Sequence, residues 1–252
     1  MPRLFLLSIS ILILSLSIIG CTDDSSDPTS PAGSNYDLVG NWRLSVWATQ
    51  QTGISGYSVS VFDSDSAYMS IDSSGHFVME MRTSNVVTMR MVGRGQYNPP
   101  QIISIIDSIM QITPGPDTIH AGDTLVQTVT LSNNNGVAIF QSRSGTTNLI
   151  NYGAYLRVGS DVKIAGVCGD YNENATTEWV GVPNVTVRCL NSAETPLQTT
   201  TTNAWGFFVF TGLTPQTLRP SGWIEINGVG TAYDNNPLPI TTSGGYAVLL
   251  MR

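Results

Sequence analysis

The alternation of apolar and polar residues along the chain constrains its fold more than any other feature. Early in the sequence, Trp42, Leu44 and Val46 alternate with polar residues. The same period recurs in further segments, namely 57–61, 67–71, 77–81, 87–91, 101–112, 124–132, 136–143 and 148–158. A period of two is typical of strands that bury one face. The pattern predicts an all-β protein whose antiparallel strands close into a barrel, because closure leaves no sheet edge exposed.

Three motifs in this region carry a family resemblance: Gly40-x-Trp42, the strand-turn-strand segment 70–77, and Gly95-x-Tyr97 followed by an apolar strand from Ile102. Residues 37–158 thereby resemble the lipocalin-like domains of bacterial envelope proteins. The resemblance implies an antiparallel β-barrel in which a late arginine, Arg143 or Arg157, covers Trp42.

Methionine is concentrated on one face of the predicted barrel strands, at Met69, Met79, Met81, Met89 and Met91. One interpretation is core filling, because methionine adapts to irregular gaps. A second is a soft pocket, formed with Trp42, for a small apolar ligand. A third is a Cu(I) site, because thioethers are soft ligands.

A second module is expected over residues 161–252. Its strand segments 162–170, 181–189 and 199–213 follow the order Gly-x-Val-x-Asp, Gly-Val-x-Val and Thr-Asp-x-x-Gly-x-Phe-x-Phe, with Cys168 in place of the valine and Asn203 in place of the aspartate. This order resembles the carboxypeptidase regulatory-like and related B-type surface domains. The resemblance implies a small Ig/prealbumin-like β-sandwich that serves as an accessory domain and has no peptidase activity.

The first 20 residues have the features of a lipoprotein signal peptide. Arg3 precedes the apolar run 4–19, which is short for a membrane-spanning helix and suited to a signal-peptide core. Ile18-Ile19-Gly20-Cys21 resembles the lipobox of bacterial lipoproteins, which implies cleavage before Cys21 and acylation of that residue. Residues 22–36 contain no large aliphatic side chain and are expected to form a flexible tether after the anchor at Cys21. The predicted location is the bacterial cell envelope, on the outer membrane because Thr22 rather than aspartate follows Cys21.

Cys168 and Cys189 fall on inward faces of two strands of the predicted sandwich. Outside the cytoplasm, cysteines are commonly oxidised. We therefore predict a Cys168–Cys189 disulfide, with two buried thiols as the alternative.

A loop in the same module carries oxygen ligands at alternate positions, at Asp170, Asn172, Asn174 and Glu178. Such spacing suits Ca²⁺. The loop lacks the glycine that permits the sharp turn of a calcium loop, so an asparagine-rich surface loop is the alternative interpretation.

The charge and the motifs of the sequence argue against several classes of function. The formal net charge is −7, Lys163 is the sole lysine, and the sequence shows no basic cluster, which argues against nucleic acid and anionic lipid headgroups as partners. No nucleophile, metal-protease or phosphate-loop motif is found, so no enzyme and no cofactor are expected. Trp179, Trp205 and Trp223 are candidates for stacking on a surface glycan. The sequence therefore favours a binding or structural protein with a surface protein or glycan as its partner. A carrier of a small apolar ligand in the barrel is the alternative.

Overall fold

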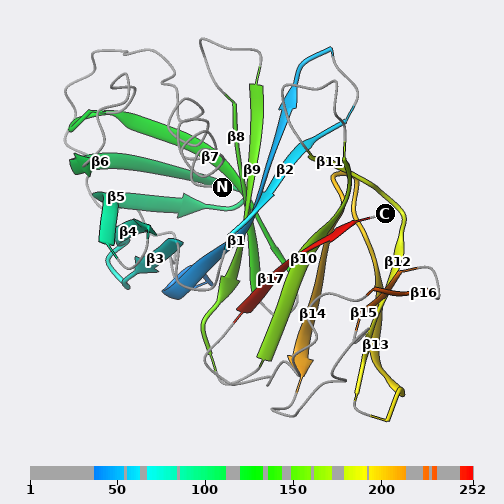
Figure 1. Ribbon diagram of the computed structural model, residues 1–252. Coiled ribbons are helices and arrows are strands. Elements are labelled where there is room, and N and C mark those ends of the chain that lie inside the picture. Colours follow the sequence, from blue (N-terminus) through cyan, green and yellow to red (C-terminus); the bar gives the residue numbers. More distant parts are fainter. Residues whose placement is uncertain are drawn as a thin grey trace.

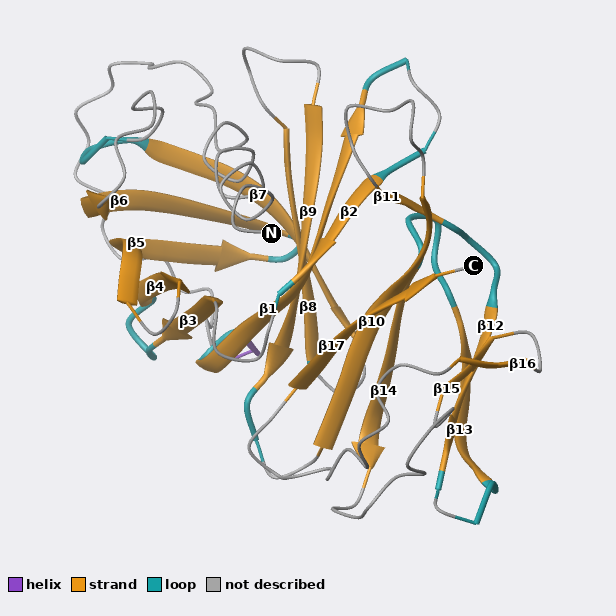
Figure 2. Ribbon diagram, viewed as in Figure 1, coloured by secondary structure: helices purple, strands orange, loops and turns teal. Residues whose placement is uncertain are grey.

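The computed structural model describes residues 37–53, 56–62, 67–83, 86–111, 120–132, 136–143, 149–159, 162–171, 179–191, 193–213, 224–226, 229–231 and 245–251. The predicted signal peptide, Cys21 and the tether lie outside these residues. The described part consists of strands and connecting turns, apart from a short 3₁₀ turn at Asp37, and contains no α-helix (Figure 2). None of its segments is a helix that could cross a membrane.

The first nine strands are β1 (Gly40–Gln51), β2 (Ser58–Val61), β3 (Ala67–Ile71), β4 (His76–Thr83), β5 (Val86–Asn98), β6 (Gln101–Gln111), β7 (Thr124–Ser132), β8 (Val137–Arg143) and β9 (Leu149–Arg157). From β3 to β9 each strand pairs antiparallel with the next, and β1 pairs with both β3 and β9 (Figure 1). Eight strands therefore close into an antiparallel barrel. The predicted all-β class and the predicted barrel are confirmed.

Strand β2 is not part of the closed barrel, although its segment was expected among the barrel strands. On one side of β1, the first part pairs with β3 and the second part, Val46–Thr49, pairs with β2. On the other side, β9 pairs with both parts. A β-bulge between Leu44 and Val46 marks the change. Because one extra residue reverses which face the following side chains occupy, Val46 leaves the barrel interior and Trp47 enters it. The simple alternation of Trp42, Leu44 and Val46 was wrong at this point.

The second module comprises β10 (Val162–Tyr171), β11 (Trp179–Gly181), β12 (Thr186–Leu190), β13 (Pro196–Thr201), β14 (Phe207–Leu213), β15 (Ile224–Ile226), β16 (Val229–Thr231) and β17 (Gly245–Met251). Strands β11, β10 and β14 continue the barrel sheet beyond β2, and β17 pairs with β10 in parallel. Strands β13, β12, β15 and β16 form a separate sheet beside them (Figure 1). The sandwich character predicted for this part is thus supported.

Two of the hydrophobic clusters among the described residues involve the barrel. One fills the barrel and contains Trp42, Trp47 and the five methionines. The other lies between the outer barrel wall and the sandwich, where Val46 and Ala48 of β1 meet Val167 of β10. Strand β10 is therefore buried on both faces, since Ile164 and Cys168, on its opposite face, are also fully buried.

In three tight turns, the side-chain oxygen of an Asp or Asn accepts hydrogen bonds from two backbone N–H groups that follow it. Asp72 Oδ1 accepts hydrogen bonds from the backbone N–H groups of Ser74 and His76. Asn203 Oδ1 accepts them from Trp205 and Phe207, and Asn191 Oδ1 from Ala193 and Thr195. Short polar side chains form such turns from local sequence alone. Asn203, which stands in place of the aspartate of the resembled motif, forms such a turn.

Candidate functional site

The end of the barrel next to the start of β1 is closed by a clasp around Trp42. Its side chain has no solvent exposure, and its Nε1–H donates to the Leu38 carbonyl oxygen at 2.8 Å. The Arg157 guanidinium lies 4.3 Å from the Trp42 ring centroid and donates to the carbonyl oxygens of Val39 and Asp37. Of the two arginines proposed to cover Trp42, the structure selects Arg157, while Arg143 is exposed.

The five methionines line one wall of the barrel, and all are buried. In the strand register, Met79 lies opposite both Met69 and Met91, and Met81 lies opposite Met89. The predicted shared face is therefore correct. Phe77, Phe140 and Tyr155 bring aromatic rings to the same interior.

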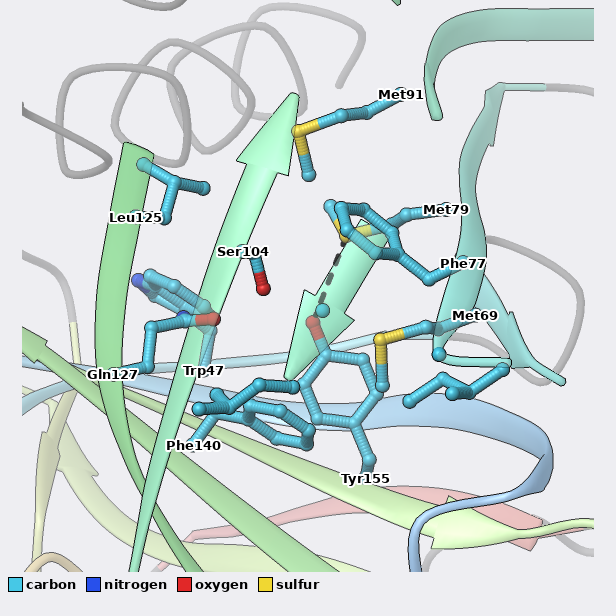
Figure 3. Close-up of a pocket in the computed structure, with 14 residues that line it drawn as sticks. Trp47, Met69, Phe77, Met79, Met91, Ser104, Leu125, Gln127, Phe140 and Tyr155 are labelled. Atoms are coloured by element: carbon cyan, nitrogen blue, oxygen red, sulfur yellow. Dashed lines mark hydrogen bonds between the residues drawn. The ribbon is translucent and has the colours of Figure 1, made fainter. Parts of the chain in front are cut away.

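A small cavity remains beside this wall (Figure 3). Its volume is about 50 Å³, which is room for a few water molecules at the roughly 10–15 Å³ that each needs. Pockets for drug-sized ligands measure about 300–1,000 Å³. The barrel is therefore largely filled by its own side chains.

Only part of the predicted pocket lines this cavity. Met69, Met79 and Met91 do, whereas Trp42, Met81 and Met89 belong to the surrounding core. Sequence reasoning missed Trp47, Ser104, Gln127, Phe140 and Tyr155, which also line it. The period of two does contain Ser104, opposite Gly95 and between the buried Ile102 and Ile106, but Trp47 is hidden by the bulge.

The polar atoms at the cavity include hydrogen-bond donors. The Trp47 Nε1–H is buried and has no acceptor. The Tyr155 hydroxyl donates only a weak bond, 3.9 Å long, to Met79 Sδ, and burial raises the pKa of Tyr155, so the phenol stays protonated at neutral pH. In Figure 3 Ser104 and Gln127 turn toward the same space.

This donor set does not favour the Cu(I) interpretation. The Tyr155 hydroxyl already occupies a lone pair of Met79 Sδ, the central sulfur of the Met69–Met79–Met91 row. Trp47, which lines the cavity, has a buried Nε1–H donor without an acceptor. Both features suit an acceptor oxygen better than a cation.

We expect Trp47→Phe to leave the free energy of unfolding within about 1 kcal/mol of wild type, because the lost ring volume is offset by removal of a buried donor without an acceptor. Trp42→Phe is the matched control, since it removes an N–H that does have an acceptor, and should cost about 1–2 kcal/mol more. Urea unfolding of both variants checks this. A larger loss for Trp47→Phe than for Trp42→Phe would contradict the assignment of an unpaired donor.

The predicted disulfide is not formed. Cys168 and Cys189 are both buried thiols, which is the alternative named above. Cys168 lies on β10 and Cys189 on β12, which belong to different sheets.

We expect neither thiol to react with iodoacetamide in the folded protein at about pH 8, and both to react in denaturant. Burial raises the pKa of the Cys189 thiol to about 12, so almost none is present as the nucleophilic thiolate. Mass spectrometry before and after unfolding measures the labelling. Two cysteines that resist alkylation in denaturant until a reductant is added would show a disulfide instead.

The remaining predicted sites fall largely outside the described residues. Of the calcium ligands, Asp170 is described and exposed, while Asn172, Asn174 and Glu178 lie outside. Within the described part, no group of three or more His, Cys, Asp and Glu is placed to hold a metal ion. Trp223 also lies outside. Trp205 is buried and stacks on Phe207, so it does not offer a face to a glycan.

Comparisons with known proteins identify no family for this chain. No model of a protein family matches it, and no curated protein matches it. Among solved structures, it is similar to a minor pilin of Streptococcus agalactiae, with a TM-score of 0.27 and 9% identity, over 93% of this chain and 92% of that chain. A TM-score this low carries no argument about fold or function.

Proposed function

We propose that this protein is a lipid-anchored, non-catalytic component of a bacterial cell envelope, in which a lipocalin-like barrel and a carboxypeptidase regulatory-like sandwich act as one rigid unit. Its role is structural or is the binding of a surface partner. The observation that carries the proposal is the shared core between barrel and sandwich.

The junction is built from aromatic rings that come from both modules. Tyr57, immediately before β2, contacts Tyr152 of β9 at a centroid distance of 5.8 Å. Tyr152 stacks on Trp205 at 6.0 Å, and Trp205 stacks on Phe207 of β14 at 5.0 Å. Aromatic pairs of this kind add about 0.5–1.5 kcal/mol each beyond their buried area.

Backbone pairing reinforces the junction. The Gly181 N–H donates to the Tyr57 carbonyl oxygen at 2.9 Å, and Val180 of β11 pairs with Ser58 of β2. Two modules that share a β-sheet and a hydrophobic core do not rotate relative to each other as domains joined only by a flexible linker do. A rigid junction between barrel and sandwich suits a structural protein, or one that keeps a bound partner in a fixed position.

The anchor is tested by growing bacteria that express the full chain with an alkyne analogue of palmitate. We expect the wild type to be labelled and Cys21→Ala to be unlabelled. Cys168→Ala, which also removes one cysteine, should keep the label. An unlabelled wild type, or a labelled Cys21→Ala, would refute the lipid anchor.

A second candidate function is the carriage of a small ligand inside the barrel. The unpaired Trp47 N–H at the cavity is the observation that favours it. The ligand would be apolar, with one acceptor oxygen. The flexible methionine side chains would have to change conformation to enlarge the cavity for it. Native mass spectrometry of the protein purified from a bacterial host tests this. A small bound molecule that is present in the wild type and absent from Trp47→Phe supports carriage. A wild-type protein without a bound molecule supports the filled barrel.

A further inference from the structure

A row of charged and aromatic side chains crosses the outer wall of the barrel. Arg43 lies opposite Tyr68, Tyr68 opposite Glu80, and Glu80 opposite Arg90. These four alternate with the inward residues Trp42, Met69, Met79 and Met91, so they face outward. Arg82, two residues beyond Glu80 on β4, shares the face. We call these five residues the arginine patch; β1, β3, β4 and β5 carry them (Figure 1).

The patch is held together by contacts around Tyr68. The guanidinium carbons of Arg43 and Arg82 lie 5.4 Å and 5.5 Å from the Tyr68 ring centroid. Arg82 Nη2 is 2.9 Å from Glu80 Oε2, and Arg90 Nε is 3.5 Å from Glu80 Oε1. The Nε atoms of Arg43 and Arg82 are buried without an acceptor, which places both side chains flat against the wall.

Positive charge in the patch exceeds negative charge. Only one carboxylate, that of Glu80, belongs to the patch; it pairs with Arg82 and Arg90, and within the described residues Arg43 forms no ion pair. The excess is two positive charges on a chain whose formal net charge is −7. Guanidinium groups gathered on one tyrosine repel each other, and an anion beside them would relieve that repulsion.

We propose that the arginine patch binds a phosphate group. Arginine presents planar N–H donors that match phosphate oxygens, and a phosphate monoester carries about two negative charges at neutral pH, which balances the excess. The side chains of Arg82 and Arg90 are 38% and 51% exposed, so the phosphate can reach them. The sequence showed no basic cluster because these arginines lie on three strands, β1, β4 and β5.

The test is calorimetric titration of the full chain, purified in a neutral detergent at constant ionic strength, with inorganic phosphate and with short-chain phosphatidic acid. We expect saturable binding that Arg43→Gln weakens about tenfold. Arg94→Gln is the matched control. Arg94 lies on β5, is 68% exposed and pairs with Asp107 at 3.2 Å, so its loss should change affinity less than about twofold.

Glu80→Gln separates a phosphate site from a merely structural ion-pair network. Removing the competing carboxylate should tighten phosphate binding severalfold, whereas a structural network would show only a change in unfolding. Tighter binding of phosphatidic acid than of phosphate identifies a lipid headgroup as the source, and equal binding identifies the phosphate group alone. No saturable binding, or equal losses for Arg43→Gln and Arg94→Gln, would overturn the proposal.

Discussion

Replacing Gly206 with alanine is expected to lower the free energy of unfolding by about 2–5 kcal/mol. Gly206 has a φ of +81°, where a Cβ is strained. An added Cβ would also lie 2.6 Å from the Cys168 carbonyl oxygen, 2.8 Å from the Val182 nitrogen and 2.9 Å from Gly181 Cα. All three are backbone atoms that cannot rotate away, so the junction of β10, β11 and β14 must open.

Gly212→Ala is the control that isolates the steric effect. Gly212 has a φ of +69°, but an added Cβ would meet nothing within 4 Å. Its cost should be about 1–2 kcal/mol, from backbone strain alone. Urea unfolding followed by tryptophan fluorescence and by circular dichroism measures both variants, and equal losses would show that the close packing around Gly206 is absent.

The same experiment tests the rigid unit. Gly206 contacts the sandwich strand β10 and the segment 181–182 that joins the barrel sheet through β2. If barrel and sandwich unfold as one unit, Gly206→Ala moves a single transition to lower urea. Separate transitions, with only one of them moved, would contradict the shared core as the basis of the proposed function.

Replacing Trp42 with alanine is expected to cost about 3–5 kcal/mol of unfolding free energy. The substitution empties a fully enclosed position of the barrel, where the side chain is 0% exposed. It also leaves the Leu38 carbonyl without its donor and removes the ring on which Arg157 lies. Chemical denaturation of Trp42→Ala against wild type measures the loss.

Arg157 contributes to the same clasp through geometry rather than charge alone. Arg157→Lys keeps the charge but loses the planar donors to Val39 and Asp37, so we expect a loss of about 1–2 kcal/mol. Arg143→Lys, at an exposed position on β8, should stay within about 0.5 kcal/mol of wild type. An equal effect at both arginines would count against the clasp.

The parts of the fold that sequence predicted well depend on local rules. The alternation located the nine strands of the first module, because side chains on a strand change face at every residue. The turn of the strand-turn-strand segment 70–77 forms between β3 and β4, where the Asp72 side chain accepts from the N–H groups of Ser74 and His76. The buried methionine wall followed from the same period, since Met69, Met79 and Met91 keep one phase.

Tertiary structure decided what depends on residues far apart in the chain. Trp47 rather than Val46 enters the barrel because a bulge reverses the phase, and a bulge leaves no mark in hydrophobicity. Cys168 and Cys189 are thiols on strands of two different sheets, although their inward positions predicted a disulfide. The arginine patch exists only because strand pairing places Arg43, Arg82 and Arg90 side by side. By itself, then, the sequence determined which segments are strands and where they turn, whereas the pairing of strands determined which faces are buried, which module touches which, and where charge gathers.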